Sequence, residues 1–310
     1  MYALFRKELA DHLDSLRFII IFALAMLLAG VSLYGALGGI QDAVGTDVSS
    51  FVFLRLFVLS GGSIPSFASF VGLVGPLIGL ILGFDAINSE KNSGTLNRLL
   101  AQPIYRDDVI NGKFLAGVVV IAVIVVSMVL LVCGVGLLKT GVAPSGEEAM
   151  RLIVFVVFSI VYISFWLGLA ILLSVVSRHA ATSVLSVVAI WLVFAFFITL
   201  IAAGLAGAFY PPESLELVEK SAVFQQQFSR ISPSILYTEA IGTILDPTIR
   251  TLGITSLAQY EQLSVAVAGV LPMGQSLLLV WPHLIGMIAE TLAAFVISYI
   301  VFMKQEIRGA

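Results

Sequence analysis

Long apolar stretches alternate with short polar ones along most of this chain. An α-helix needs about 20 apolar residues to cross a hydrocarbon layer of roughly 30 Å, and six runs are long enough. Backbone groups in lipid must pair within their own segment, so these runs should be helices; barrel strands would alternate apolar with polar residues, and these runs do not. The predicted spans are residues 18–38, 64–84, 113–138, 152–176, 183–209 and 276–303.

Residues 1–17 carry an amphipathic pattern. Apolar side chains recur every three or four residues, while Arg6, Lys7 and Asp11 lie mostly off that stripe. Such a helix can lie flat in the lipid headgroup region or cap the first span, and both readings stay open. The apolar core that follows is about twice as long as that of a signal peptide and has no clear cleavage site, so we interpret it as an anchor.

Residues 85–112 form a polar island between the second and third spans, with helix signals of its own. Asn88 and Ser89 are expected to cap a short helix, and Gly94 permits a chain reversal. Asp107 and Asp108 stand where the next helix should begin, because the positive end of the helix dipole favours negative charge.

The island also has an apolar stripe. Leu96, Leu99 and Leu100 fall on one helical face, and Pro103 should end that short helix. Apolar side chains that project into water need a cover. Two covers are open at this point: the bilayer interface, or a partner protein.

Composition and charge place this island in the cytoplasm. The chain is 59% hydrophobic and 11% charged, with a mean hydropathy of +1.08, which excludes a soluble domain. With both termini on one side, ten of the 16 lysines and arginines lie on that side. Positive charge is concentrated on the cytoplasmic side of membrane proteins, so both termini and residues 85–112 are predicted to be cytoplasmic.

Residues 210–275 then form one long external segment. Pro211 and Pro212 open it at a plausible helix start, and the apolar residues 263–271 are too few to span. A loop of this length is seldom idle. It is either a folded lid over the outer ends of the spans, or a docking surface or exit gate.

Few residues could carry chemistry. Gly112-Lys113 is followed by Phe114 where a phosphate-binding loop needs Ser or Thr, so no ATP site is expected in this chain. Neither the single cysteine, Cys133, nor the three histidines match a metal-ligand spacing, so no metal is expected either.

Glu290 lies near the middle of the last span, where a charge costs several kcal/mol unless it is paired or protonated. It is either a polar transport site or a protonated glutamate that holds helices together. The second reading is favoured because the sequence indicates no second charge inside the membrane. Gly75, Gly79 and Gly83 share one face of the second span and predict close helix packing, within the subunit or between two copies.

The island resembles the signature of the ABC-2 type transporter permeases. In that family an acidic residue precedes Gly-Thr-Leu, Leu-Leu, Pro, Arg and a Gly-Lys that opens the third span. The matching positions here are Glu90, Gly94, Thr95, Leu96, Leu99, Leu100, Pro103, Arg106, Gly112 and Lys113. Arg6, Lys7 and Glu8, the six spans, and Pro233 with Tyr237 are also similar. Within that family, the chain resembles the single-polypeptide subgroup that includes the nitrous-oxide-reductase maturation permease.

This resemblance implies an all-α polytopic fold in one transmembrane domain, 1–310. Residues 1–17 would be the connecting helix and residues 85–112 the coupling segment docked on a separate cytoplasmic ATPase. That ATPase would use ATP and Mg, and the permease itself would bind no cofactor. It also implies a second permease copy, the cell membrane of a bacterium or archaeon, and no nucleic acid.

An exporter is the expected function on this reading. Two alternatives stay open: a permease that transmits ATPase motion to an extracytoplasmic protein docked on residues 210–275, and a proton-coupled carrier that works through Glu290. The substrate is not indicated by any residue of the spans.

Overall fold

The structure, a computed structural model, describes residues 2–43, 51–95, 105–212, 214–252 and 270–305. Within these ranges the regular structure is helical, apart from one isolated β-bridge between Gly61 and Ile64. The elements are α1 (Tyr2–Leu13), α2 (Leu16–Ala43), α3 (Val52–Val58), α4 (Phe67–Gly83), α5 (Asn88–Asn92), α7 (Arg106–Thr140), α8 (Gly146–Val176), α9 (Ala180–Leu192), the π-helical turn η1 (Val193–Phe197), α10 (Ile198–Phe209), α11 (Leu215–Ser229), α12 (Pro233–Leu245) and α14 (Met273–Lys304).

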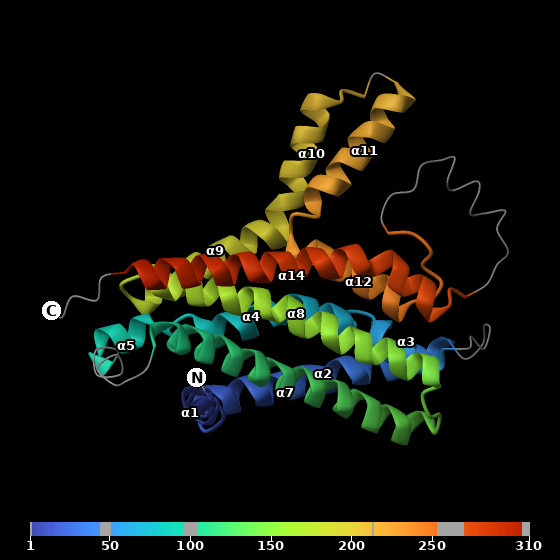
Figure 1. Cartoon of the computed structure of the whole chain (residues 1–310). Helices are drawn as coiled ribbons and strands as arrows, with labels where there is room; N and C mark the ends of the chain where they lie inside the picture. The colour runs from blue at the N-terminus through green and yellow to red at the C-terminus, as the bar shows by residue number, and fades with distance from the viewer. Residues whose placement is uncertain (1, 44–50, 96–104, 213, 253–269, 306–310) are drawn as a thin grey trace.

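Six helical stretches in the described part of the chain are long and apolar enough to cross a membrane. Each overlaps one predicted span, so the all-helical, six-span prediction is confirmed. The stretches run side by side, except that the second half of the fifth turns away from the others, and α5 lies at the same end of the bundle as the last turn of α14 (Figure 1). They are Leu16–Gly39, Phe67–Asn92, Arg106–Thr140, Gly146–Val176, Ala180–Phe209 and Met273–Lys304.

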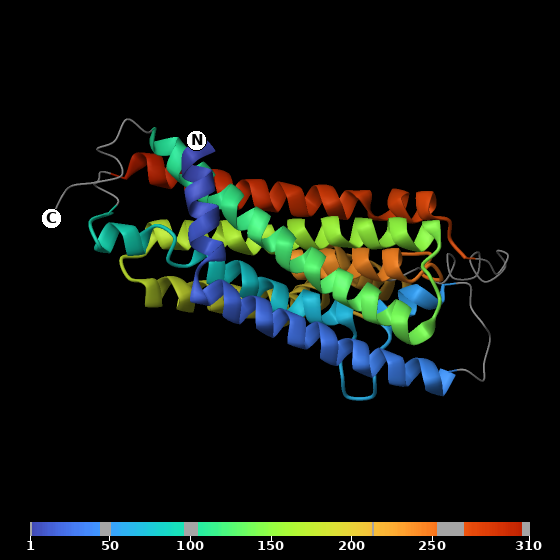
Figure 2. The same ribbon diagram turned by 90° about the horizontal axis from the view of Figure 1, so that it is seen from below.

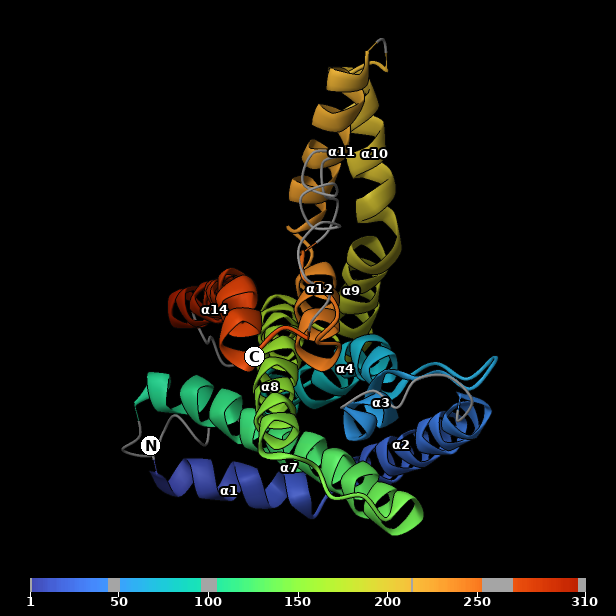
Figure 3. The ribbon, with the colours of Figure 1, turned by 90° about the vertical axis from the view of Figure 1, so that its right-hand side faces the viewer.

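Helix α8 is the centre of the bundle. In the view along the helices it lies among α4, α7, α12 and α14 (Figure 3). Its large side chains Phe155, Tyr162 and Trp166 are fully buried. The glycine face of α4 packs on it: a Cβ at Gly79 would lie 2.7 Å from the carbonyl oxygen of Ile163. Close backbone approach therefore holds the second and fourth spans together.

We expect Gly79→Ala to lower the free energy of unfolding by about 1–3 kcal/mol, because the added methyl group meets backbone atoms that cannot turn aside. Thermal unfolding of the purified protein measures the effect. Gly30→Ala is the matched control, since a Cβ there has no heavy atom within 4 Å. Equal melting temperatures for the two variants would contradict this packing.

The N-terminal helix is shorter than predicted. α1 ends at Leu13 rather than continuing to residue 17, and Leu16 belongs to α2. Ser15 makes the break, because its Oγ donates to the carbonyl of His12 at 2.7 Å and accepts from the N–H of Phe18 at 3.1 Å. α1 therefore turns away from α2 and crosses the first turns of α7 (Figure 2).

The fifth apolar helix leaves the bundle partway along its length. α9 packs on α8, but after η1 the chain turns outward, and α10 pairs with α11 in a hairpin that stands away from the other helices (Figure 1). The chain returns beside its point of departure, where Ser232 Oγ donates to the carbonyl of Phe194 at 2.9 Å.

α12 then packs against α8 and α14. The sequence predicts no helix of the bundle within the segment 210–275, whereas the structure packs residues 233–245 against the spans. The reason is an apolar stripe, Leu236, Ala240, Ile241 and Ile244, that recurs at helical spacing and is 7% exposed or less. The short apolar run 263–271 falls largely outside the described residues.

Candidate functional site

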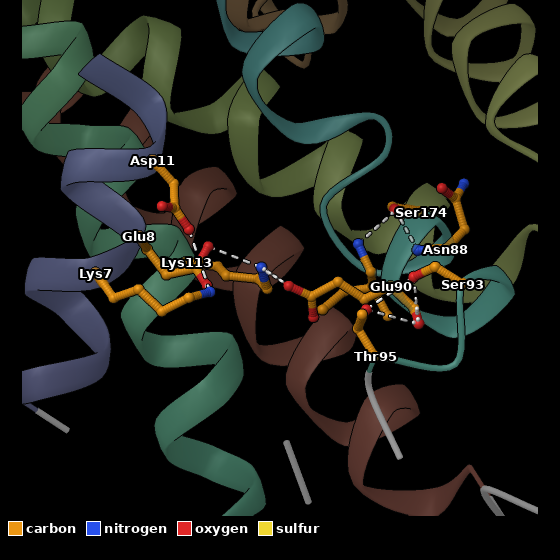
Figure 4. Close-up of polar contacts among 10 residues, drawn as sticks. Lys7, Glu8, Asp11, Asn88, Glu90, Ser93, Thr95, Lys113 and Ser174 are labelled. Atoms are coloured by element: carbon orange, nitrogen blue, oxygen red, sulfur yellow. Dashed lines mark hydrogen bonds and ion pairs between the residues drawn. The ribbon is translucent and has the colours of Figure 1, made fainter. Parts of the chain in front are cut away.

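A buried ion cluster lies where α1, α5 and α7 meet. The Nζ of Lys113 donates to Glu8 Oε2 and to Glu90 Oε1, both at 2.8 Å (Figure 4). The Lys113 side chain is 6% exposed, that of Glu8 8% and that of Glu90 21%. Lys7 approaches Glu8 at 3.5 Å from the exposed side of α1. One lysine thus joins the N-terminal helix, the polar island and the third span.

The local fold of the island positions Glu90. The predicted side-chain cap at Asn88 or Ser89 is wrong: the N-cap residue is Ile87, without a side-chain hydrogen bond. Ser174 of α8 supplies the cap, because its Oγ accepts from the N–H groups of Ile87 and Asn88 at 3.0 and 3.1 Å (Figure 4). The short helix that bears Glu90 is therefore fixed to the central span.

The turn after α5 follows the sequence pattern. Gly94 has a φ of +70°, in the left-handed region that the expected chain reversal requires. The hydroxyls of Ser93 and Thr95 donate to the carbonyl of Glu90 at 3.3 and 3.2 Å. These contacts close the turn around the residue that reaches Lys113.

The start of α7 presents Lys113 to α1. Asp107 and Asp108 lie in its first turn, as their charge predicts. A Cβ at Gly112 would lie 3.5 Å from Leu4 Cγ, in ordinary van der Waals contact, so α1 packs directly over this position. Lys113 follows directly and extends between the two helices. The Gly-Lys pair thus serves helix contact and charge pairing.

A pocket of about 590 Å³ opens beside the cluster. Its charged lining includes Glu8, Asp85, Glu90, Lys113 and Arg17, and Arg17 is hydrogen-bonded to Asp85. His12 also lines it, and burial lowers the pKa of that histidine. Charged side chains from the ends of the first three spans thus meet and pair at this pocket.

Two further contacts tie the island to the ends of the other spans. The side-chain amide of Asn92 donates to the carbonyl of Arg178, after α8, at 3.0 Å. Arg106 donates to the carbonyl of Gln305, after α14, at 3.4 Å, and the Gln305 amide reaches the Val175 carbonyl at 2.7 Å. Displacement of the island would therefore pull on α8 and α14 as well as on α1 and α7.

The remaining predicted residues lie apart from the cluster or outside the described ranges. Arg6 is exposed, with its guanidinium 5.8 Å from the ring of Tyr2. Leu96, Leu99, Leu100 and Pro103 lie outside the described residues. Gly75, Gly79 and Gly83 face α8 within the same chain.

Glu290 is partly buried in α14, and its Oε2 has no hydrogen-bond partner among the described residues. The structure adds a polar pair of side chains that the sequence does not indicate. His283, on the same helix, contacts Glu239 of α12 at 2.8 Å. The two residues are 44 positions apart, and no local spacing could have paired them.

Sequence analysis counts Arg151 only as a positive charge, whereas the structure gives it a role in helix packing. It lies in the first turns of α8, is fully buried, and donates to the carbonyls of Ile244 and Leu271 at 2.8 and 2.6 Å. It also reaches Ser276 Oγ at 3.2 Å and Glu147 at 2.9 Å. One side chain thereby joins the end of α12 and the start of α14 to the central span.

Comparison with known proteins adds a family. The model for ABC-2 family transporter proteins matches residues 2–307 of this chain. The probable ABC transporter permease protein NosY of Pseudomonas aeruginosa is 32% identical over 127 residues, 39% of this chain and 40% of that protein. The protein of the same name from Stutzerimonas stutzeri is 33% identical over 122 residues, 39% of each chain. The matched region thus covers about two fifths of the length of each of these relatives.

Proposed function

Because this chain belongs to the ABC-2 family of transporter proteins, in which it is a membrane-spanning permease subunit without a nucleotide-binding site, we propose that it is driven by a separate cytoplasmic ATPase through residues 85–112. The ion cluster of Glu8, Glu90 and Lys113 carries this proposal. It fixes the island to α1 and α7 at the point where a docked subunit would push.

The proposed direction of transport is export. ATP binding brings two ATPases together, each one displaces the island of the permease copy on which it sits, and the attached helices shift as a rigid body between two arrangements. A partner can do this only if it binds the two arrangements with different affinity. The hydrogen bonds of Asn92 and Arg106 extend the attachment to α8 and α14.

The proposed orientation places both termini and the island in the cytoplasm of a bacterium or archaeon. Lys91, Arg106 and Lys113 all lie at that end of the bundle, with Arg6 and Lys7. The family membership leaves the proton-coupled carrier without support, because ATP supplies the energy in an ABC transporter.

Replacement of Leu96, Leu99 and Leu100 with aspartate tests the docking. We expect co-purification of the ATPase with the permease to fall at least about tenfold, because burying a carboxylate in an apolar contact without a partner costs several kcal/mol. The matched control adds the same three negative charges to the island but keeps the leucines: Asn97→Asp, Gln102→Glu and Asn111→Asp. Full association of the leucine variant would refute the docking role.

Transmission of force to an extracytoplasmic protein remains a second candidate, favoured by the hairpin of α10 and α11. Glu216 and Lys220 on α11 are exposed and paired with each other at 2.6 Å, on a helix that stands clear of the bundle (Figure 3). Shortening the hairpin separates the two functions. If the shortened variant loses both export and ATP turnover, transport is supported. If it loses binding of the extracytoplasmic partner but keeps ATP turnover, force transmission is supported.

A further inference from the structure

A second pocket, of about 400 Å³, lies between α4, α12 and the junction of α9 with η1. α12 contacts both α4 and η1, and α4 contacts α9, so these elements form its walls (Figure 3). α12 lies toward the end of the bundle opposite α5 (Figure 1). The pocket is therefore separate from the ion cluster and from the island on which the ATPase is proposed to dock.

The mouth of this pocket faces the hydrocarbon of the bilayer. Leu73 of α4 and Phe196 of η1 line the pocket, and these residues are 47% and 54% exposed. Both belong to helical stretches that are long and apolar enough to cross a membrane. Their exposed faces therefore meet lipid tails, and a ligand of this pocket enters from the bilayer.

The lining of the pocket selects against charge. Among the residues that the structure describes, no charged side chain lines it. A bound ion would lose its water without gaining a counter-charge, which costs far more than burying a neutral polar group. The walls are aliphatic and aromatic but carry five hydroxyl groups, those of Ser66, Ser69, Ser234, Tyr237 and Thr238. A matching ligand is therefore uncharged and has a polar head that forms hydrogen bonds.

The hydroxyl groups of α12 are hydrogen-bond acceptors for such a ligand. The Tyr162 hydroxyl donates to the carbonyl of Gly72 at 2.8 Å, so in its 3.1 Å contact with Ser234 the serine is the donor. The Thr238 hydroxyl donates to the carbonyl of Ser234 at 2.7 Å. A hydroxyl group has one proton and two lone pairs. Ser234 and Thr238 have thus used their protons and keep lone pairs for a ligand.

The wall formed by α4 supplies a donor. Ser66 Oγ accepts from the N–H of Ser69 at 3.3 Å, and the two serine hydroxyl oxygens lie 2.9 Å apart. One proton fills that contact, whichever serine donates it, and the proton of the other serine is left for a ligand. The Tyr237 hydroxyl is engaged with Ser159 at 2.9 Å. The pocket therefore offers acceptors on one wall and a donor on another, which suits an alcohol, because a hydroxyl group both donates and accepts.

The third wall is an unusual piece of helix. Ala195 and Phe196 belong to the π-helical turn η1, and turns of this kind are frequent at functional sites. The Ser232 hydroxyl donates to the carbonyl of Phe194 at 2.9 Å, which fixes η1 to the helix that carries the acceptors. The walls of the pocket are therefore held together at the base of the hairpin of α10 and α11.

We propose that this pocket binds an uncharged lipid with a hydroxylated head, such as an acylglycerol. Ser234 and Thr238 accept hydrogen bonds from the head, and the pair of Ser66 and Ser69 donates one to it. The acyl chain lies against the aromatic wall and continues through the mouth into the bilayer. The volume is within the range of about 300–1,000 Å³ that is usual for ligand pockets. Binding at this site needs no ATPase, so the inference goes beyond the proposed function.

The fluorescence of Trp191, which lines the pocket, reports on binding. The chain has three tryptophans, so Trp166→Phe with Trp281→Phe leaves Trp191 as the only one. Three probes share one dibromostearoyl chain, whose bromine atoms quench a neighbouring indole. They are the monoacylglycerol, the methyl ester, which lacks a hydroxyl group, and the lysophosphatidic acid, which adds a charged phosphate. Each probe is titrated by mole fraction into nanodiscs that hold the purified permease alone.

We expect saturable quenching by the monoacylglycerol, with half-saturation at a mole fraction at least about tenfold below that of the other two probes, because only this probe pairs the hydroxyl groups without bringing a charge. Equal half-saturation for the three probes would overturn the proposal. Quenching by the monoacylglycerol that rises without saturation would also overturn it, whatever the association of the ATPase with the permease.

Variants of α12 assign the binding to this pocket. Ser234→Ala with Thr238→Val removes both acceptors and should raise the half-saturation for the monoacylglycerol about tenfold. Thr243→Val is the matched control, because its hydroxyl also donates to the carbonyl four residues earlier, that of Glu239 at 3.2 Å, but it does not line the pocket. We expect unchanged binding for this control. Equal half-saturation for the double variant and the control would place the lipid elsewhere and overturn the proposal.

Discussion

Replacing Lys113 with methionine is expected to abolish ATP-dependent transport and to lower the melting temperature. Methionine fills a similar volume but leaves Glu8 and Glu90 facing each other without the cation that both contact at 2.8 Å. Removing one partner from a buried ion pair costs about 3–5 kcal/mol. The loss falls on the junction of α1, α5 and α7, so the island should lose its attachment to both other helices. Transport into inverted vesicles and thermal unfolding measure the two effects.

A neutral triple variant distinguishes coupling from folding. Lys113→Met combined with Glu8→Gln and Glu90→Gln removes all three charges, and replacing a whole buried ionic group is often neutral for stability. We expect the triple variant to recover most of the melting temperature but not transport. If the triple variant recovered both melting temperature and transport, the cluster would only stabilise the fold. Normal transport by Lys113→Met alone would contradict the coupling role.

Replacing Arg151 with alanine is expected to have the second largest effect, a loss of about 3 kcal/mol in the free energy of unfolding. The variant leaves the carbonyls of Ile244 and Leu271 without the donor they share inside the bundle. It also removes the contact with Ser276 at the start of α14. The end of α12 should then separate from α8 and α14 before the rest of the bundle unfolds.

Arg151→Lys is the matched control for this effect. A lysine keeps the charge but, as a single ammonium, cannot reproduce the planar fork of donors, so an intermediate loss is expected. Hydrogen exchange of residues 233–245 locates the change, and protection there should fall before protection in α7. Unchanged exchange in α12 together with an unchanged melting temperature for Arg151→Ala would show that the contacts carry no stability.

The spans and the glycine face could be predicted because their signals are local. Hydropathy over about 20 residues selects a helix in lipid whatever surrounds it. A left-handed residue such as Gly94 or a charged first turn such as Asp107 and Asp108 depends on the adjacent backbone alone. Residue type and spacing therefore suffice for elements of this kind.

The errors have three different causes. The cap of α5 comes from Ser174, 87 positions from Ile87, and the partner of His283 is 44 positions away on another helix. The end of α1 was missed although Ser15 is adjacent, because the apolar spacing continues through Leu16 while the serine competes for the backbone. The apolar stripe of α12 is too short to suggest a span, so the sequence alone predicts no bundle helix there.

The sequence by itself determined the solvent, the six helices, the family resemblance and the importance of the polar island, since each rests on residue types within a short window. Only the tertiary structure decided that Glu8, Glu90 and Lys113 form one cluster, and that Arg230, Glu239 and His283 form another. The physical reason is that a buried charge must find its counter-charge somewhere in the fold, and chain folding, not spacing, chooses which one it meets.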